Sequence, residues 1–197
     1  FRSLSTKTAG QRDAVKAMCD LAKDVSDWMQ TKGGLPPAAI PDVRGEHPAE
    51  IARMLRREWG LGLHPVKNML NLLEAKGVRV FALPENCREI DACSFWCDKT
   101  PFVLLNTEVS NERMRFDMAH ELLHLVAHRH SSPFGKAAED EANCFAREFL
   151  MPAESVQVNR ARVWTLDTLI SKKRVWNVSV SALAYRLHSL GYLSDWH

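Results

Sequence analysis

Two histidines and a glutamate stand at a spacing that is typical of a metal site. His120 and His124 are four residues apart, and Glu121 directly follows the first of them in the segment HELLH. On a helix, residues four apart lie on the same face one turn from each other, so both imidazoles could bind one ion. Glu121 could then contact a metal-bound water without binding the metal itself. The pattern predicts metal-assisted hydrolysis with Glu121 as the catalytic base.

The residues around this motif favour a buried position for it. The segment from Met118 to Val126 is mostly apolar apart from the motif. Burying unpaired histidine and glutamate side chains is costly, and a bound ion would account for their presence there. The alternative is a helix whose polar residues merely face solvent.

A third protein ligand is expected, because a catalytic zinc usually has three and keeps its fourth position for water. His130 is one candidate, since HELLHLVAHRH fits the pattern HExxHxxGxxH except at its glycine. Glycine would let the helix end in a tight turn that returns the third histidine to the metal. Ala127, a strong helix former, stands there instead, so we expect the helix to continue and to keep His130 away from the ion.

Glu139, fifteen residues after His124, is the third ligand that we favour. It lies near the start of a predicted helix, three residues before Ala142 and seven before Ala146, and therefore on or beside the apolar face of that helix. If this helix packs on the HExxH helix, it brings the Glu139 carboxylate to the ion. Glu141 is the alternative ligand on the same helix.

Two further residues are expected to lie next to the ligands. Asn143, one turn after Glu139, could accept the ring N–H of a ligand histidine and so fix the orientation of that ring. His128 is expected to be a polar residue near the helix end, or a group that contacts a ligand. The spacing does not assign the donor that stabilises the tetrahedral oxyanion, for which the candidates are Tyr185, Tyr192, His128, His188 and the arginines.

The ligand types indicate Zn²⁺, with Mn²⁺ as a substitute in vitro. Two histidines and a carboxylate neutralise more of the metal charge than three histidines would. The water is then less acidified, and a base close to it matters more. Glu121 is expected to take the proton of the water and to pass it to the leaving amine.

Helices are expected to carry both halves of this site. Ser110 is a plausible N-cap for the helix that reaches about Ala127, and Ser179 caps a helix near the C-terminus. A capping box begins at Thr8, and prolines open two more helices. The predicted helical ranges are 9–32, 48–59, 65–76, 111–127, 136–150 and 180–190.

Three short strands are expected between the third and fourth of these helices, at residues 78–83, 90–97 and 101–106. Turn residues separate them, at 84–86 and 98–99. An antiparallel meander is the simplest arrangement of such strands. The fold class is therefore α+β, mainly helical with a small three-stranded antiparallel sheet.

Composition and charge are those of an ordinary globular protein. The 197 residues are 46% hydrophobic and 25% charged, and the formal net charge of +2 requires no nucleic-acid or membrane partner. No apolar run is long enough to span a membrane, no signal peptide is visible, and the five cysteines are expected to be reduced thiols. We therefore expect a cytoplasmic protein. Because the chain starts at Phe1 rather than at methionine, we also expect a fragment or processed product that lacks an N-terminal domain.

The two halves of the predicted site together resemble the ImmA/IrrE metallopeptidases, which are minimal gluzincin-like zinc proteases. The resemblance rests on His120-Glu-Leu-Leu-His124, on Glu139-x-x-Ala142-Asn143-x-Phe145-Ala146 and on Leu150-Met151-Pro152. The second element is also similar to the E-x-x-S-D element of thermolysin-type enzymes, which favours Glu139 as the ligand. Family members commonly have glycine where this chain has Leu123.

This resemblance covers roughly residues 63–193 and implies three regions. They are an N-terminal helical region (1–62), a zinc metallopeptidase core (63–160) and a helical C-terminal region that resembles a helix-turn-helix (161–197). The opening Phe1-Arg2-Ser3-Leu4 resembles the segment that follows an XRE-type DNA-binding domain in two-part members of the family.

The same resemblance implies a function in transcription regulation. Family members cleave helix-turn-helix repressors at one bond and so relieve repression in stress, DNA-damage or mobile-element responses, and others belong to toxin–antitoxin-like operons. We therefore expect a site-specific zinc endopeptidase with a protein substrate, an XRE-type repressor.

The alternative function is a regulator that binds DNA or a partner protein and keeps the zinc fold as a scaffold. Its contact with DNA would come from a preceding N-terminal domain or from the basic segment Lys172-Lys173-Arg174. The intact Glu121 favours catalysis, because a scaffold needs the two histidines but not the base.

Overall fold

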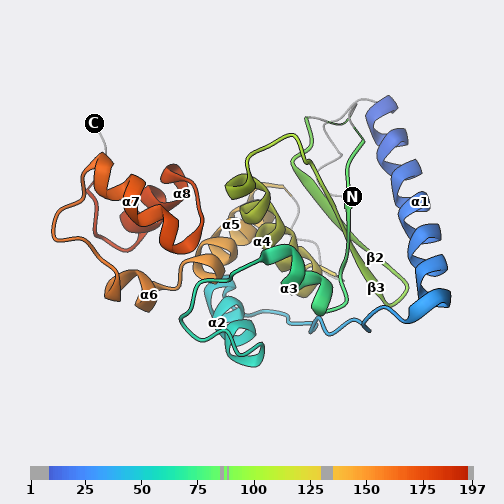
Figure 1. Cartoon of the computed structure of the whole chain (residues 1–197), viewed down its shortest axis with the longest axis horizontal. Helices are drawn as coiled ribbons and strands as arrows, with labels where there is room; N and C mark the ends of the chain where they lie inside the picture. Colours follow the sequence, from blue (N-terminus) through green and yellow to red (C-terminus); the bar gives the residue numbers. More distant parts are fainter. Residues whose placement is uncertain (1–8, 85–86, 88, 130–134, 195–197) are drawn as a thin grey trace.

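The computed structural model describes residues 9–84, 87, 89–129 and 135–194. Helices and a small sheet make up this part of the chain, so the expected α+β class is confirmed (Figure 1). No described helix is long and apolar enough to cross a membrane. The helices are α1 (Ala9–Gly33), α2 (Pro48–Glu58), α3 (Met69–Ala75), α4 (Asn111–Ala127), α5 (Lys136–Leu150), α6 (Ala153–Val158), α7 (Leu166–Trp176) and α8 (Val180–Ser189), and the strands are β1 (Arg79–Ala82), β2 (Ala92–Cys97) and β3 (Thr100–Leu105).

The sheet is mixed, so the expected antiparallel meander is wrong. Its order is β1-β3-β2, and β3 pairs with β1 in parallel and with β2 in antiparallel orientation. Asp98 and Lys99 form the expected tight turn between β2 and β3, and Asp98 has a φ of 53°. The connection from β1 to β2 (residues 83–91) is longer, and buried Cys87 and Ile90 anchor it in the core. The described residues at both ends of the connection bond to the end of β3, since the Leu83 N–H donates to the Leu105 carbonyl (2.7 Å) and the Asn106 N–H to the Asp91 carbonyl (2.9 Å). β3 therefore lies between the other two strands.

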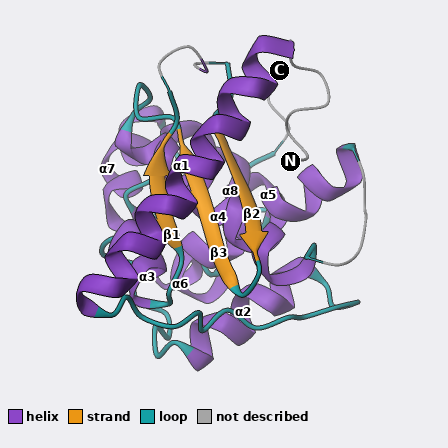
Figure 2. Cartoon of the chain, turned by 90° about the vertical axis from the view of Figure 1, so that its right-hand side faces the viewer, coloured by secondary structure: helices purple, strands orange, loops and turns teal. Residues whose placement is uncertain are grey.

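Helices cover both faces of the sheet. α1 lies across one face (Figure 2), where its Val15 packs in a cluster with Phe102 and Leu104 of β3. On the opposite face, Val103 and Leu105 of β3 join the main core together with α4 and α5. Since neighbouring residues of a strand point to opposite faces, β3 contributes to both clusters.

The helix that carries the HExxH motif, α4, begins as expected and ends at Ala127. The Ser110 side chain accepts the N–H of Arg113 (3.2 Å), which makes it the N-cap. His128 leaves the helical conformation (φ −107°, ψ 16°), although Ala127 favours helix. The predicted range of this helix, 111–127, is confirmed, whereas the expected continuation beyond Ala127 is wrong. His130 lies outside the described residues.

The other predicted helix boundaries were mostly close. Ser179 is the N-cap of α8, as expected, and α5 has the predicted range. α3 begins at Met69 rather than at residue 65, because extended Asn68 accepts the N–H of Asn71 and caps the helix there. The predicted cap at Thr8 lies outside the described residues.

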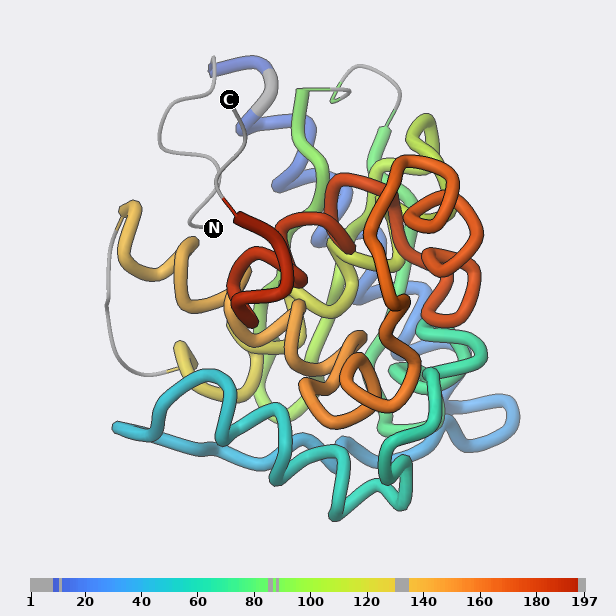
Figure 3. Tube along the Cα trace, turned by 90° about the vertical axis from the view of Figure 1, so that its left-hand side faces the viewer, coloured from blue at the N-terminus to red at the C-terminus, as the bar shows by residue number. Residues whose placement is uncertain are grey.

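The C-terminal helices complete the main core at the end of the molecule opposite α1 (Figure 1). In Figure 3, α7 and α8 lie nearest the viewer, in orange-red and red. Trp176 is fully buried, and its ring N–H donates to Ser155 of α6 (3.1 Å). Leu183 and Leu187 of α8 belong to the same core cluster as Ile51 of α2. The main core thus draws residues from all three expected regions, whose boundaries stay a prediction.

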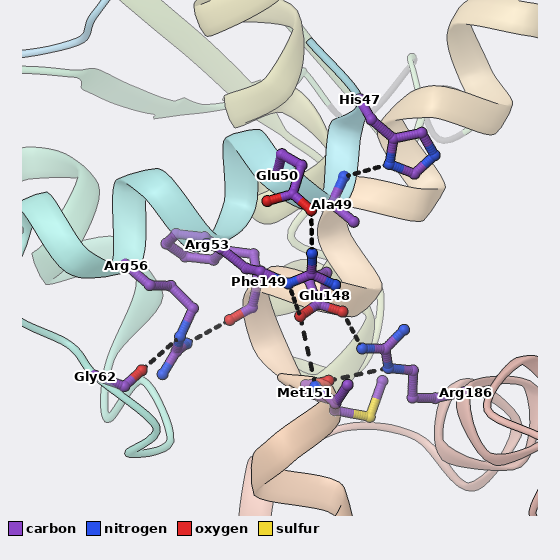
Figure 4. Close-up of polar contacts among 11 residues, drawn as sticks. His47, Ala49, Glu50, Arg53, Arg56, Gly62, Glu148, Phe149, Met151 and Arg186 are labelled. Carbon is purple, nitrogen blue, oxygen red and sulfur yellow. Dashed lines mark hydrogen bonds and ion pairs between the residues drawn. The ribbon is translucent and has the colours of Figure 1, made fainter.

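One buried carboxylate, that of Glu148, connects three helices (Figure 4). Glu148 of α5 is 3% exposed and accepts from Arg53 Nε of α2 (3.2 Å) and from Arg186 Nη2 of α8. Arg186 Nε also donates to the carbonyl of Met151 (3.0 Å). Beside it, Arg56 of α2 donates to the carbonyls of Gly62, His64 and Phe149. These charge-assisted bonds hold α2 and α8 against α5.

Candidate metal centre

Side chains from two packed helices, α4 and α5, converge at one point. His120 and His124 come from α4, and Glu139 comes from the first turn of α5. The Nε2 atoms of the two histidines are 3.2 Å apart. Glu139 Oε2 lies 3.1 Å from His120 Nε2, and Glu139 Oε1 lies 3.9 Å from His124 Nε2. The structure therefore brings together the three residues that the sequence predicted as ligands.

These separations fit a tetrahedral zinc ion. Two ligand atoms at about 2.0–2.1 Å from zinc and at a tetrahedral angle lie about 3.3–3.4 Å apart. The distances from His120 Nε2 to His124 Nε2 (3.2 Å) and to Glu139 Oε2 (3.1 Å) are within a few tenths of an ångström of that value. The distance from His124 Nε2 to Glu139 Oε1 (3.9 Å) is longer. The Glu139 side chain is 47% exposed, so its carboxylate can adjust toward an ion. Two imidazole nitrogens and a carboxylate oxygen are also donors that zinc accepts in catalytic sites.

The pKa values of His120 and Glu139 are shifted in opposite directions. Burial by itself disfavours the charged form of His120, but the hydrogen bond to Glu139 and the charge of Glu121 outweigh it, so the pKa of His120 is raised. The hydrogen bond with His120 in turn lowers the pKa of Glu139. A metal ion would take the place of the proton in this hydrogen bond, which is the usual competition at histidine and carboxylate ligands.

Asn143 lies where the sequence predicted it. Its side-chain oxygen is 3.2 Å from His120 Nδ1. Ring N–H donation from Nδ1 to this oxygen makes Nε2 the nitrogen that would lose its proton and bind an ion, and Nε2 is the atom that faces His124 and Glu139.

His128 contacts the second histidine of the motif. His124 Nδ1 lies 2.8 Å from His128 Nδ1, and His128 Nε2 lies 2.8 Å from Glu141 Oε2. Glu141, the alternative ligand, thus pairs with His128 and is not in the cluster of described residues that could hold an ion. The spacing of four between His124 and His128 was the sequence signal for this contact, but it did not indicate the partner on α5.

Glu121 is buried beside the cluster and has a partner that the sequence did not reveal. It is 7% exposed, and Ser94 of β2 donates a hydrogen bond to its Oε2. Burial raises the pKa of Glu121, although the nearby His120 and the Ser94 hydrogen bond offset part of the effect. A carboxylate in this environment is a stronger base than one in water. Ser94 belongs to a strand far from the motif in sequence, so no local pattern predicts the contact.

The cluster opens into a cleft of about 720 Å³ between α4 and β2. β2 is an outer strand of the sheet formed by the described residues. One side of the cleft is formed by its residues Cys93, Ser94, Phe95 and Trp96. The ligand pair of α4, Glu121, Glu139 and Asn143 form the other side. A volume of this size lies within the range of ligand-binding sites.

Charged residues occupy both ends of the cleft. At one end, Arg113 pairs with exposed Asp91 (2.7 Å) and with buried Asp117 (3.1 Å). Burial raises the pKa of Asp117 to about 6, and the charge of Arg113 offsets part of this effect. At the other end, the guanidinium of Arg129 stacks on Trp96 (3.8 Å).

Among the candidate donors for the oxyanion, Arg113, Arg129 and His128 line this cleft. Tyr185, Tyr192 and His188 are absent from the described lining, and Tyr185 instead lies beneath Arg147 (4.3 Å). Arg113, Arg129 and His128 therefore remain as the candidate donors in the cleft.

Comparison with known protein families matches residues 73–188 to the IrrE N-terminal-like domain, a family of peptidases. No curated protein matches the chain. The matched segment runs from α3 into α8 and contains the sheet, the HExxH helix and the helix of Glu139. It covers more than half of the chain, which supports the resemblance drawn from the two motifs. The chain therefore belongs to the family of IrrE N-terminal-like domains and is a metallopeptidase of the ImmA/IrrE type.

Proposed function

We propose that this peptidase is a zinc-dependent endopeptidase that cuts a helix-turn-helix repressor at one bond and so relieves repression. The observation that supports the zinc chemistry is the convergence of His120, His124 and Glu139 beside the buried Glu121. The repressor substrate is inferred from the family resemblance of the HExxH and E-x-x-A-N elements.

The residues of the cleft divide the reaction between them. Zinc held by His120, His124 and Glu139 would supply a Lewis acid that polarises the scissile carbonyl and acidifies water. Glu121 accepts the proton of the attacking water, because its buried carboxylate has a raised pKa. It then gives that proton to the nitrogen of the leaving peptide. Ser94 holds the carboxylate in place through its hydrogen bond to Oε2.

The outer strand β2 is the part of the cleft that can align a substrate. One edge of β2 pairs with β3, and the described strands leave its other edge without a neighbour. An extended segment of the substrate can add to such an edge through backbone hydrogen bonds. Since β2 lines the same cleft as Glu121, a substrate strand paired with β2 would have its peptide bonds close to the Glu121 carboxylate. The preferred substrate is therefore a linker or unfolded segment rather than a helix.

A cleavage assay tests this function. Wild type and Glu121→Gln would be loaded with Zn²⁺ and incubated with an XRE-type repressor encoded beside the gene, and the products would be identified by mass spectrometry. We expect one cut in the repressor and a decrease in kcat of about 10²–10⁴-fold in the variant, with bound zinc unchanged. Equal rates for the two proteins would refute the role of Glu121. An intact repressor after incubation with the zinc-loaded wild type would refute the substrate.

The alternative function, a regulator that binds DNA through the basic segment 172–174, is less well supported than the peptidase function. Lys172 and Lys173 of α7 are half-buried, and Lys173 pairs with Glu112 of α4 (2.7 Å). A lysine that is occupied in this way is a poor contact for DNA phosphates.

A further inference from the structure

Arg115 of α4 is a buried cation whose charge the described chain does not neutralise. The residue is 6% exposed, and its Nη2 donates to the carbonyl of Val66. Its Nε is the one buried side-chain nitrogen or oxygen of the described residues that has no hydrogen-bond partner. No ion pair joins it to a described carboxylate, and burial lowers its pKa. Burying a guanidinium in this way is costly unless something else pairs with it.

The other buried arginines of the described chain are compensated. Arg56, 3% exposed, donates to three backbone carbonyls, and Arg186, 8% exposed, pairs with Glu148. Arg115 is thus an exception within a protein that otherwise satisfies its buried guanidinium groups.

Arg115 lines a second cavity, of about 810 Å³, on the side of α4 that faces α3 and β1. This volume lies within the range of small-molecule sites, which is about 300–1,000 Å³. One part of the wall is apolar and includes Met69, Leu70, Phe81 and Met114. Other parts carry polar groups that can donate hydrogen bonds, on Lys67, Asn68, Asn111 and Asn177. An apolar wall with a few converging donors is typical of a site for an amphipathic ligand.

The charges around the cavity favour an anion with a single negative charge. Two acidic residues line it, Glu74 and Glu112, and Glu112 is paired with Lys173 (2.7 Å). Lys67 and Arg115 are the cations of the lining. Because Lys173 neutralises Glu112, these two cations face only one uncompensated acid, Glu74, and the cavity has a net charge of one positive. A planar guanidinium matches the two oxygens of a carboxylate.

We propose that this cavity binds a small organic carboxylate, whose acid group pairs with Arg115 and whose apolar body lies against Met69, Leu70 and Phe81. The site is separate from the metal centre, because Arg115 lines the cavity next to α3 while His120 of the same helix lines the catalytic cleft. Its ligand would therefore contact α4 at a different side from the one that carries the metal ligands. This binding is independent of the proposed repressor cleavage.

Direct titration of the zinc-loaded chain by calorimetry tests the proposal. Octanoate is the first probe, and N-acetyl-leucyl-leucine, which ends in a peptide carboxylate, is the second, so that the two arms distinguish a fatty acid from a peptide terminus. We expect one of them to bind with one-to-one stoichiometry. Octanol, which has the apolar body alone, and inorganic phosphate, which has the charge alone, should bind at least about tenfold more weakly. No binding of either carboxylate at millimolar concentration would overturn the proposal, and so would octanol binding as tightly as octanoate.

Variants assign the binding to this cavity. Arg115→Met should weaken octanoate binding by about tenfold or more. A second series replaces Leu70, which lines the cavity. Because Leu70 is 37% exposed, polar residues at this position should leave the fold intact even if Arg115→Met does not fold. Leu70→Glu should bind octanoate more weakly than Leu70→Gln, and Leu70→Lys more tightly, whereas Leu21→Glu on α1 should bind as wild type does. Equal affinities across the Leu70 series, or an Arg115→Met chain that binds like wild type, would refute the assignment.

Discussion

His128 Nε2 lies 2.8 Å from a carboxylate oxygen of Glu141, and this pair connects α5 to the second histidine of the metal motif. Through its other ring nitrogen, His128 contacts His124 Nδ1 (2.8 Å). If His128 Nε2–H donates to Glu141, then His128 Nδ1 can accept the Nδ1–H of His124. The pair thereby keeps the lone pair of His124 Nε2 on the side of His120 and Glu139.

Replacing His128 should therefore weaken metal binding without removing a ligand. We expect His128→Leu to lower the affinity for Zn²⁺ by about 10–100-fold, measured by competition with a chromophoric chelator. Glu141→Gln should have a smaller effect, because its amide oxygen can still accept from the ring. An affinity equal to that of wild type in His128→Leu would show that the ring does not orient His124.

Glu139 should decide whether the site retains its metal. Glu139→Ala removes the ligand from α5 and leaves two histidines, which is fewer than a catalytic zinc usually has. We expect substoichiometric zinc after dialysis, measured by elemental analysis, whereas Asp140→Ala, at an exposed neighbouring position, should retain one ion per chain. Since His130 was the other candidate, His130→Ala is the decisive comparison. Loss of zinc in His130→Ala and its retention in Glu139→Ala would reverse the assignment.

Glu148 should be important for stability although it lies outside the cleft. Glu148→Ala leaves Arg186 buried without its carboxylate and removes a partner of Arg53. Removing one member of a buried ion pair costs about 3–5 kcal/mol of unfolding free energy, to be measured by urea titration. Glu50→Ala removes the exposed partner of the same Arg53 and should cost less than about 0.5 kcal/mol. Similar values for the two variants would mean that Glu148 is not the link between the helices.

Asp117 should make stability depend on pH in an unusual direction for a carboxylate. Burial raises its pKa to about 6 in the folded chain, from 3.8 as the ordinary value. A raised pKa means that the folded state binds the proton more tightly, so stability is greatest below about pH 4 and is lost as pH rises through about 6. In the chelator-treated protein, the free energy of unfolding of wild type relative to Asp117→Asn should fall by up to about 3 kcal/mol across this window.

The matched control for this titration is Asp91→Asn, since Asp91 pairs with the same Arg113 but is exposed. Its unfolding free energy should fall over the same pH window as that of wild type, but by a smaller amount, because the charge of Asp91 contributes to the raised pKa of Asp117. If instead wild type gained stability over Asp117→Asn as the pH rose, the ion pair with Arg113 would outweigh burial and the assigned direction would be wrong.

The residues that sequence could predict are those whose relationship is local. His120, Glu121 and His124 share one helix, and the helical period alone fixes how they are arranged. Ser110 was predictable as an N-cap because a cap contacts the residues just after it. Glu139 required one further step, the packing of two amphipathic helices, and the apolar face of α5 supplied it.

Contacts between distant segments could not be predicted in this way. Ser94 meets Glu121 only because β2 passes over α4, and nothing in either segment encodes the other. The mixed sheet has the same origin, since β3 pairs with both β1 and β2, and neither of those strands encodes which neighbour it takes. The missing partner of Arg115 is likewise a property of the packed molecule, because burial is decided by segments far away in sequence.

The division of the ligands between α4 and α5 has a thermodynamic consequence. Zinc bound there would act as a crosslink between two helices, and a crosslink that forms only in the folded state adds its binding free energy to folding. Each tenfold rise in free zinc above the dissociation constant would then stabilise the fold by about 1.4 kcal/mol. By the same reciprocity, a substitution that loosens α5 at its far end, such as one at Glu148, would lower the occupancy of the metal site. Zinc supply and the resistance of this protein to unfolding would thus rise and fall together.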